Sequence, residues 1–296
     1  MAEYKDGFVE LTTLYTYYKN GNLESKIIGY WPDHPINHIA TFPTIENETL
    51  RQIVLLRGFI MHCETGPAYQ TWWRNGKVGI KAYYTFNKLH RQSGPAYKSR
   101  TRKGILTDKL YCINGQLTRT DGPAAEYWYH SGIKCSKYWI IDGVFHHDEK
   151  YAVITWYKDG SLWYKKWYKS GYVDRDNKPA MKTWWPNGQL MKINYLKMSE
   201  HYRRNGPTKI GWHENGTMSQ KLYRRAREYH RGDGPAIQAW YDDGTPSRVE
   251  WYWCDKLHCQ TEAATQEWNE DGFKYCNEWY LNGKYQPMLE GVLDRH

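Results

Sequence analysis

Gly94-Pro95-Ala96 is the stretch that decides the fold, because it recurs along the chain at a fixed interval. Gly-Pro-Ala stands at 66–68, 94–96, 122–124 and 234–236, and weaker copies stand at 178–180 and 206–208. Every interval between copies is 28 residues or a multiple of it. A fixed period of this length is typical of repeat architectures, in which each repeat buries its apolar surface against its neighbours. The sequence therefore predicts a tandem array of about nine repeats.

All repeats after the first carry a second glycine, ten residues after their first position, with aromatic residues on both sides. In most repeats this glycine follows Asn or Asp, and such pairs are the strongest short-range signal for a two-residue hairpin turn. A tryptophan stands four residues before the glycine, except where Arg100 takes its place. Tyr or Trp stands seven residues after it. The glycines are Gly76, Gly104, Gly132, Gly160, Gly188, Gly216, Gly244 and Gly272.

The positions within one repeat predict which side chains share a face. If Asn75-Gly76 is a two-residue turn, Tyr83 falls opposite Ala68, and both share a face with Trp72 because side chains alternate along a strand. The small alanine then leaves room for a large ring. We expect this face to be aromatic and the opposite face to carry more Lys, Arg, Glu and Thr. A second turn, clear in Asn114-Gly115, follows the second strand.

These features predict an all-β fold, an elongated single-layer array of antiparallel β-hairpin repeats. We divide the chain into an N-terminal cap with one degenerate hairpin (1–37), the tandem repeats (38–285) and a C-terminal tail (286–296). Irregular terminal repeats are expected, since the open edges of a sheet must be covered.

The composition is aromatic and basic, with Trp 16, Tyr 27, only Phe 6 and a net charge of +9. Amphipathic rings suit half-exposed strands. The positive charge favours acidic partners such as nucleic acid, anionic lipid or acidic protein, and a scattered basic surface is the alternative. The six cysteines fall at different repeat positions, which indicates a reducing compartment rather than a disulfide framework. No apolar run reaches the length of a signal-peptide core or a membrane span.

The stretch His90-Arg91-Gln92-Ser93-Gly94-Pro95-Ala96, followed by an aromatic strand and a turn glycine, resembles the divergent MORN-type repeats. Similar copies stand at 119–124 and 230–236, and the resemblance covers roughly residues 34–285. The longer variant of these repeats occurs in multiple copies in large DNA viruses, particularly those infecting amoebae. The resemblance implies an array of antiparallel hairpins that acts in binding or scaffolding, with no catalytic residue to carry over.

Histidine also recurs at one repeat position, and a catalytic residue has no reason to do so. We therefore expect each such imidazole to bond the backbone of the turn it follows. The stretches 146–149 and 254–259 resemble metal clusters, but no second Cys or His pair stands at zinc-finger spacing, so we predict no metal site. A nucleophile elbow, a P-loop and a dinucleotide fingerprint are absent from the sequence. We expect a protein that is not an enzyme and has no cofactor.

Arginine recurs at the position that follows the histidine. Equivalent residues in adjacent repeats lie two strands apart, about 9–10 Å, and such a row suits the phosphates of a rod-like polyanion. The recurring residues are Arg91, Arg119, Arg175, Arg203 and Arg231. We predict that they bind double-stranded DNA together with Arg204, Arg100, Arg102 and Lys103. The alternative is that each arginine pairs within its own loop, with Asp121 or Asp233 for example, or stacks on a neighbouring ring.

The sequence thus favours a non-enzymatic protein that binds double-stranded DNA through phosphates, without sequence selectivity, as a viral structural or packaging-associated factor. Its expected location is the virion and the host cell cytoplasm. The alternative is a protein-interaction scaffold that forms homodimers or longer assemblies through its terminal repeats. A third hypothesis, by analogy with choline- and glucan-binding cell-wall repeats, is disfavoured because those are secreted, shorter in period and usually acidic or neutral.

Overall fold

The computed structural model describes residues 8–32 and 59–287. Every regular element in these ranges is a β-strand, which confirms the predicted all-β array of antiparallel hairpin repeats. The chain divides into two compact bodies, the N-terminal body (1–144) and the C-terminal body (145–296). Of the predicted cap (1–37), the described part is one hairpin, and the predicted tail (286–296) lies outside the described residues from 288 on.

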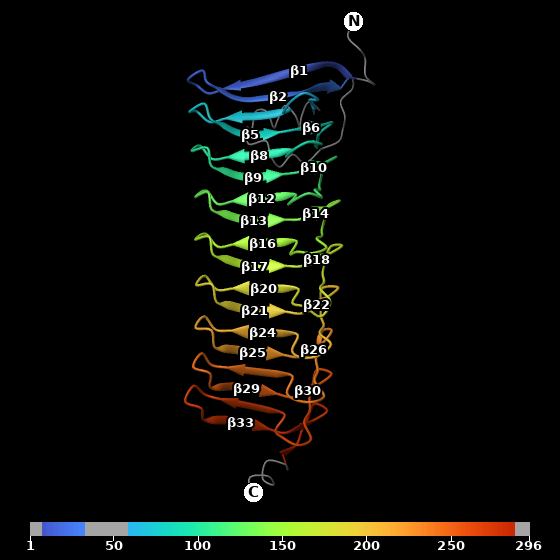
Figure 1. Ribbon diagram of the computed structural model, residues 1–296, viewed down its shortest axis with the longest axis vertical. Helices are drawn as coiled ribbons and strands as arrows, with labels where there is room; N and C mark the ends of the chain where they lie inside the picture. Colours follow the sequence, from blue (N-terminus) through green and yellow to red (C-terminus); the bar gives the residue numbers. More distant parts are fainter. Residues whose placement is uncertain (1–7, 33–58, 288–296) are drawn as a thin grey trace. The chain divides into compact units, whose positions relative to one another are not determined.

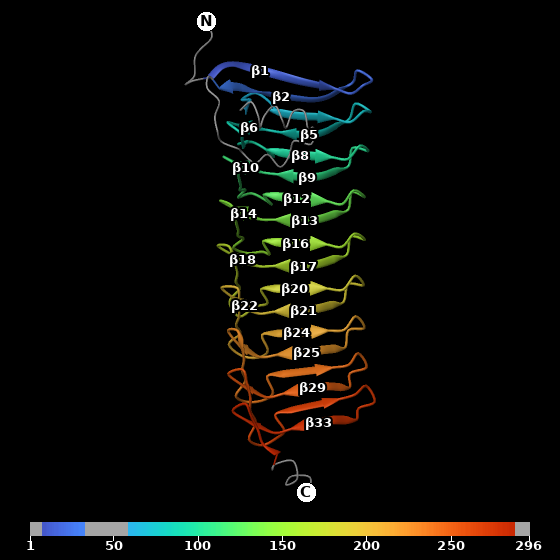
Figure 2. The same cartoon turned by 180° about the vertical axis from the view of Figure 1, so that it is seen from behind.

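The N-terminal body is built on one antiparallel sheet. Its long strands are β1 (Phe8–Tyr17), β2 (Leu23–Pro32), β4 (Tyr69–Trp72), β5 (Val78–Ala82), β8 (Tyr97–Arg100), β9 (Leu106–Leu110), β12 (Ala125–Trp128) and β13 (Lys134–Tyr138), with β3 (Ile60–Met61) beside β2. Consecutive strands of this series pair with each other. Short hairpins stand along one side of the sheet (Figures 1 and 2): β6 (Tyr84–Thr85) with β7 (Lys88–Leu89), and β10 (Cys112–Ile113) with β11 (Gln116–Leu117). The strands β14 (Ile140–Ile141) and β15 (Val144–Phe145) follow.

The C-terminal body repeats the same plan. Its sheet contains β16 (Val153–Trp156), β17 (Leu162–Lys166), β20 (Met181–Trp184), β21 (Leu190–Asn194), β24 (Lys209–Trp212), β25 (Met218–Leu222), β28 (Ile237–Trp240), β29 (Pro246–Glu250), β32 (Thr265–Trp268) and β33 (Lys274–Glu278), paired in that order. Its short hairpins are β18 (Tyr168–Lys169) with β19 (Tyr172–Val173), β22 (Leu196–Lys197) with β23 (Glu200–His201), β26 (Arg224–Arg225) with β27 (Glu228–Tyr229), β30 (Tyr252–Trp253) with β31 (Lys256–Leu257), and β34 (Tyr280–Leu281) with β35 (Lys284–Tyr285).

The first turn of each repeat is longer than predicted. The Trp73 amide donates to the Lys77 carbonyl and the Gly76 amide donates to the Trp73 carbonyl, so the loop has three residues, and Gly76 is left-handed (φ +78°). A β-bulge next to this loop shifts the register by one residue. Three-residue loops with a left-handed glycine are the usual alternative to two-residue turns. The two-residue prediction was wrong, yet the bulge restores the predicted register, with Tyr69 opposite Ala82.

The second turn has the two-residue geometry. Asn114 (φ 49°) and Gly115 (φ 84°) are both left-handed, as a type I′ turn requires, and Ile113 pairs with Gln116 across it. Left-handed backbone costs little at Asn or Gly but is strained at bulky residues. Other repeats nevertheless place Phe86 and Met198 at the first turn position.

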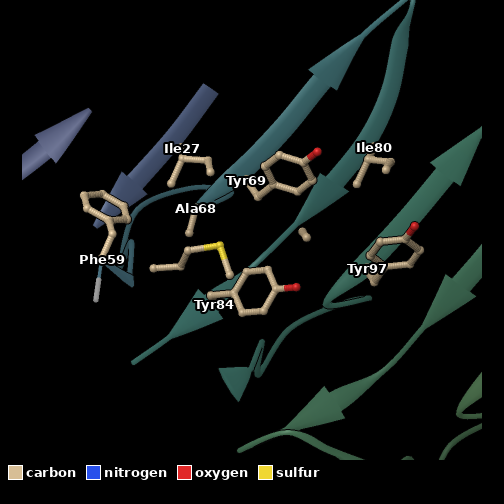
Figure 3. Packing of buried hydrophobic residues seen from close by; sticks show 9 residues of the cluster. Ile27, Phe59, Ala68, Tyr69, Ile80, Tyr84 and Tyr97 are labelled. Atoms are coloured by element: carbon tan, nitrogen blue, oxygen red, sulfur yellow. The ribbon is translucent and has the colours of Figure 1, made fainter. Parts of the chain in front are cut away.

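The core is small and lies where the short hairpins fold back onto the sheet. The recurring alanine, such as Ala68, is fully buried, as its place beside large rings predicts. Figure 3 shows the largest cluster, in the N-terminal body, where Phe59, Tyr84 and Ala68 lie near Ile27 and where Tyr69, Ile80 and Tyr97 continue the apolar layer along the sheet.

Neighbouring repeats are joined by side chains as well as by strands. The Trp73 Nε1 donates to the Arg100 carbonyl (2.9 Å), and Tyr157 and Tyr241 use their hydroxyls in the same way, 27 residues along the chain. The loop asparagine Asn75 donates to the Arg102 carbonyl (2.9 Å). A phenylalanine could not form these bonds, which explains why the rings here are Tyr and Trp.

Candidate functional site

One face of each sheet carries a row of lysines that the predicted division into an aromatic and a polar face did not place. Because side chains alternate along a strand, Gln70 points to the same side of the sheet as Ala68 and Trp72. Lys81 is directly opposite Gln70 and therefore points to this side as well. We call this side the lysine face. The prediction of a mainly aromatic face was wrong on this point, although the predicted register already placed Lys81 opposite Gln70.

In the N-terminal body the row runs straight across the strands. Directly opposite partners follow one another in the order Lys26, Gln70, Lys81, Lys98, Lys109, Glu126 and Lys137. Adjacent strands lie about 4.8 Å apart, so Lys81, Lys98 and Lys109 are neighbours. Like charges directly opposite each other destabilise a sheet. Lys81, Lys98 and Lys109 therefore repel one another in the folded sheet.

The distribution of carboxylates divides the row. Glu126 forms ion pairs with Lys109 (3.2 Å) and Lys137 (3.8 Å) and is almost buried. Among the described residues no carboxylate pairs with Lys81 or Lys98. Burial lowers the pKa of Lys98, and the neighbouring charges of Arg100, Lys109, Arg91 and Lys81 lower it further. The positive charge is thus least compensated around Lys98.

A hollow of about 690 Å³ opens on the lysine face at this point. It lies where the tryptophan series is broken, since Arg100, one of its lining residues, stands where the other repeats have Trp. Six cationic side chains line it, and none of the described lining residues is acidic. They are Lys77, Lys81, Arg91, Lys98, Arg100 and Lys103. We call this the cationic hollow.

The row is weaker in the C-terminal body. There the equivalent positions pair Ile154 with Lys165, Lys165 with Lys182, and Ile193 with Ile210. Lys165 and Lys221 extend over the tryptophan rings of following repeats, at 5.8 and 5.6 Å from the centroids. Uncompensated positive charge on this face is therefore concentrated in the N-terminal body.

The five recurring arginines are largely occupied within their own loops, as the alternative hypothesis held. Each guanidinium lies over the aromatic ring that precedes it, with Cζ 3.9 to 4.1 Å from the ring centroid. Each Nη1 also donates to the proline carbonyl four residues on. The residues are Arg91, Arg119, Arg175, Arg203 and Arg231.

Two of these arginines are neutralised as well. Arg119 pairs with Asp121 (2.6 Å) and Arg231 pairs with Asp233 (2.8 Å), and each guanidinium side chain is only 21% exposed. The hydrogen bond from Arg119 lowers the pKa of Asp121. Arg91 differs, because it lines the cationic hollow in addition to stacking on its ring.

The other predicted binding residues are separated in space. Arg100 and Lys103 line the cationic hollow, whereas Arg102 is exposed beside them and lines a hollow on the opposite face. Arg204 is exposed in the C-terminal body, where Arg203 and Arg225 line the same depression together with Asp233. Lys77, Lys81 and Lys98 complete the cationic hollow. None of these three lysines stands among the residues that were predicted to bind DNA.

The recurring histidines have a structural role. The Nδ1 atom of His90 accepts the Asn114 amide (3.1 Å), and His146 and His258 accept equivalent amides. The turn is that of the following repeat, not the one that the histidine follows, so the prediction was right about the type of contact and wrong about the turn. Among the described residues no group of three or more His, Cys, Asp or Glu side chains could hold a metal ion. No helix in the described ranges has the length and apolar character needed to cross a bilayer.

No protein-family model and no curated protein matches the chain. Weak structural similarity exists to the Tc holotoxin pore of Photorhabdus luminescens (12% identity, TM-score 0.19), to a TcdB2–TccC3–Cdc42 complex (12%, 0.16) and to TcdB2–TccC3 (10%, 0.16). The alignments cover 78%, 85% and 91% of this chain but only 10%, 12% and 16% of those chains. At these TM-scores the similarity supports no conclusion about fold or function.

Proposed function

We propose that this protein is a non-enzymatic nucleic-acid-binding protein that holds double-stranded DNA by its phosphates on the lysine face of the N-terminal body. The observation that carries the proposal is the cationic hollow, six positive side chains without a lining carboxylate, in line with the Lys81–Lys98–Lys109 row. The proposal moves the interface from the recurring arginines to the lysines, because most of those arginines are engaged in their own loops.

The spacing of the charges favours a polyanion over a single small anion. Lys81 and Lys98 line the hollow on successive strands, about 4.8 Å apart, and Lys109, which pairs with Glu126, continues the row on the next strand. Contacts of this kind release counterions, so affinity falls steeply with salt and depends little on base sequence. The resemblance to MORN-type repeats of large DNA viruses supports a structural or packaging-associated role, in the virion and the host cell cytoplasm.

The test uses matched pairs of lysines. We would titrate a random-sequence duplex with the full chain at several salt concentrations and follow fluorescence anisotropy. Lys81→Gln with Lys98→Gln removes one cross-strand pair from the N-terminal body, and Lys165→Gln with Lys182→Gln removes the equivalent pair from the C-terminal body. If each lost charge contacts one phosphate, the first variant reduces the slope of log K against log salt by about 1.8.

Arg100→Trp adds an independent variant, because it restores the residue found at this position in the other repeats. The tryptophan fills the cationic hollow with a side chain that the other repeats already accommodate. We expect the affinity for duplex DNA at low salt to fall at least tenfold. Equal losses in the two lysine pairs, or binding that is insensitive to salt, would contradict the proposed interface. The absence of any binding at low salt would reject the DNA-binding function.

A separate observation supports a second candidate function, self-association through a terminal repeat. Among the described strands β33 pairs only with β32, and two exposed rings stand at it, Tyr275 (61%) within the strand and Phe273 (68%) directly before it. An edge strand with apolar side chains is a template for another chain. Sedimentation of wild type and of a Phe273→Ser, Tyr275→Thr variant would decide this, since a scaffold that associates at this edge becomes monomeric in the variant.

A further inference from the structure

In the N-terminal body the face opposite the lysine face carries a ladder of rings with one gap among the described residues. Tyr18 donates its hydroxyl to the Trp72 carbonyl (2.8 Å), and the Trp73 Nε1 donates to the Arg100 carbonyl (2.9 Å). The next position in this series is occupied by Thr101. An aromatic side chain at this position would reach the Trp128 carbonyl, 27 residues further along the chain. Threonine is too short for this bond. Its hydroxyl accepts the amide of Ile105 within its own loop instead (3.2 Å).

The position of Trp73 shows how a ring sits in this ladder. A Cβ atom built on Gly79 would lie 3.3 Å from the Trp73 Nε1, so the indole lies directly over residue 79. The equivalent of Gly79 in the next repeat is Thr107. The missing ring at position 101 would therefore lie over Thr107.

A second hollow, of about 800 Å³, is found where that ring is missing. Tyr18 and Glu24 line one end of it, Trp128 and His130 line the other, and Trp73, Thr107 and Asp108 line it between them. The Trp128 side chain follows Glu126 by two residues and points to the lysine face, so Trp128 meets this hollow through its backbone. The Ser99 hydroxyl donates to the Asp108 carboxylate (2.5 Å) and also contacts Thr107. The site thus combines the rings of Trp73 and Tyr97 with a carboxylate that can accept further hydrogen bonds. We call it the ring gap.

From this geometry we infer that the ring gap binds a planar nitrogen heterocycle with N–H donors, of the nucleobase class. The ligand ring takes the place of the missing side chain, and its donors face the Asp108 carboxylate and the Trp128 carbonyl. Bases stack on aromatic side chains with little dependence on sequence. Guanine suits the carboxylate best, because its N1–H and N2–H groups are adjacent donors and a carboxylate accepts two bonds side by side. The carboxylate disfavours an anionic ring.

This site lies on the face opposite the cationic hollow, and the inference does not rest on the proposed DNA binding. A neutral ligand separates the two, because guanosine carries no phosphate for the lysine face. We would titrate guanosine into the full chain and follow tryptophan fluorescence together with the NMR signals of the indole N–H groups. Binding in the millimolar range or tighter, with a shift of the Trp73 indole N–H signal, is the expected result.

Two variants and one control locate the binding. Thr101→Tyr restores the ring ladder, so we expect an unchanged or higher melting temperature and at least a tenfold loss of guanosine affinity. Asp108→Asn keeps the shape and removes the charge, and it should weaken guanosine by a similar factor. Asn269→Tyr fills the equivalent position in the C-terminal body, where Asn269 also replaces a ring, and should change nothing.

Three outcomes overturn the inference. The first is no response to millimolar guanosine, and the second is equal affinity in the wild type and in both Thr101→Tyr and Asp108→Asn. The third is a response to glucose that matches the one to guanosine, which would assign the ring gap to a carbohydrate. If Thr101→Tyr does not fold, the comparison of Asp108→Asn with the wild type decides the result.

Discussion

The hydrogen bonds between rings and carbonyls make a sharp prediction for Tyr241→Phe. The substitution keeps the ring and removes only the hydroxyl, which donates to the Trp268 carbonyl at 2.7 Å. The bond is partly buried and joins two repeats, so we expect a loss of stability without a change in fold. Tyr157→Phe removes the equivalent bond to Trp184 (3.0 Å) and serves as an independent repetition.

The magnitude follows from the kind of bond. A neutral hydrogen bond contributes about 1 kcal/mol net, since water replaces part of what is lost. For a body of this size, a change of about 1 kcal/mol shifts the melting temperature by about 2–4 °C. The two tyrosines lie three repeats apart with no shared partner. The double variant should therefore lose about 2 kcal/mol, because distant sites are additive.

Urea unfolding followed by tryptophan fluorescence measures this loss, with Tyr172→Phe as the control. Tyr172 is half exposed and stands outside the ring ladder, so its substitution should leave the midpoint unchanged. If Tyr241→Phe and Tyr172→Phe unfold at the same urea concentration, the ring–carbonyl bonds do not stabilise the array. A double variant that loses no more than either single one would show that the repeats do not behave as independent neighbours.

Three further predictions concern charge, protonation and thiol reactivity. Replacing Lys98 by Gln should raise stability at low salt by about 0.5 kcal/mol, because it relieves repulsion with Lys81 and Lys109, and thermal melts at two salt concentrations measure this. Burial lowers the pKa of His201, so the unfolded chain binds the proton more tightly. Stability should therefore fall as the pH drops below the ordinary histidine value of about 6.5, and His201→Gln should reduce that fall in unfolding experiments at pH 7.5 and 5.5. Burial raises the pKa of Cys112 to about 11, whereas Cys254 is exposed, so mass spectrometry after iodoacetamide should find Cys254 modified first and Cys112 only on unfolding.

The repeat made the architecture predictable, but not the details that shape the site. A period of 28 residues with turn glycines and aromatic positions led to hairpins and to the correct pairing of Tyr69 with Ala82. The three-residue loop was missed because Asn-Gly fits both kinds of turn, and only the geometry beyond the turn distinguishes them. The lysine face was misassigned for a different reason, because the recurring Trp, Tyr and Ala positions were used to define the face and the lysines between them were not followed from strand to strand.

The candidate site shows a second limit of sequence periodicity. A residue that recurs, such as Arg203, was predicted to bind a partner, but recurrence here reflects a bond that each repeat needs for itself. Both hollows lie instead where the pattern is broken, at Arg100 and Thr101. Arg100 was visible in the sequence as an exception. The character of the hollow on each face of the sheet depends on the residues around Lys98 and Asp108. Only the structure shows which residues these are.

The bonds that join one repeat to the next also bear on how such a chain changes in length. Each ring and each loop asparagine finds its partner one period further on, as Trp73 does at Arg100 and Trp185 at Trp212. Duplication or loss of one whole repeat inside a body therefore leaves every remaining donor with an acceptor. A single residue inserted within a strand shifts the strand register by one residue. It also moves the side-chain donor away from its acceptor in the next repeat. Copy number is thus the variable that evolution or design can alter most freely in this protein.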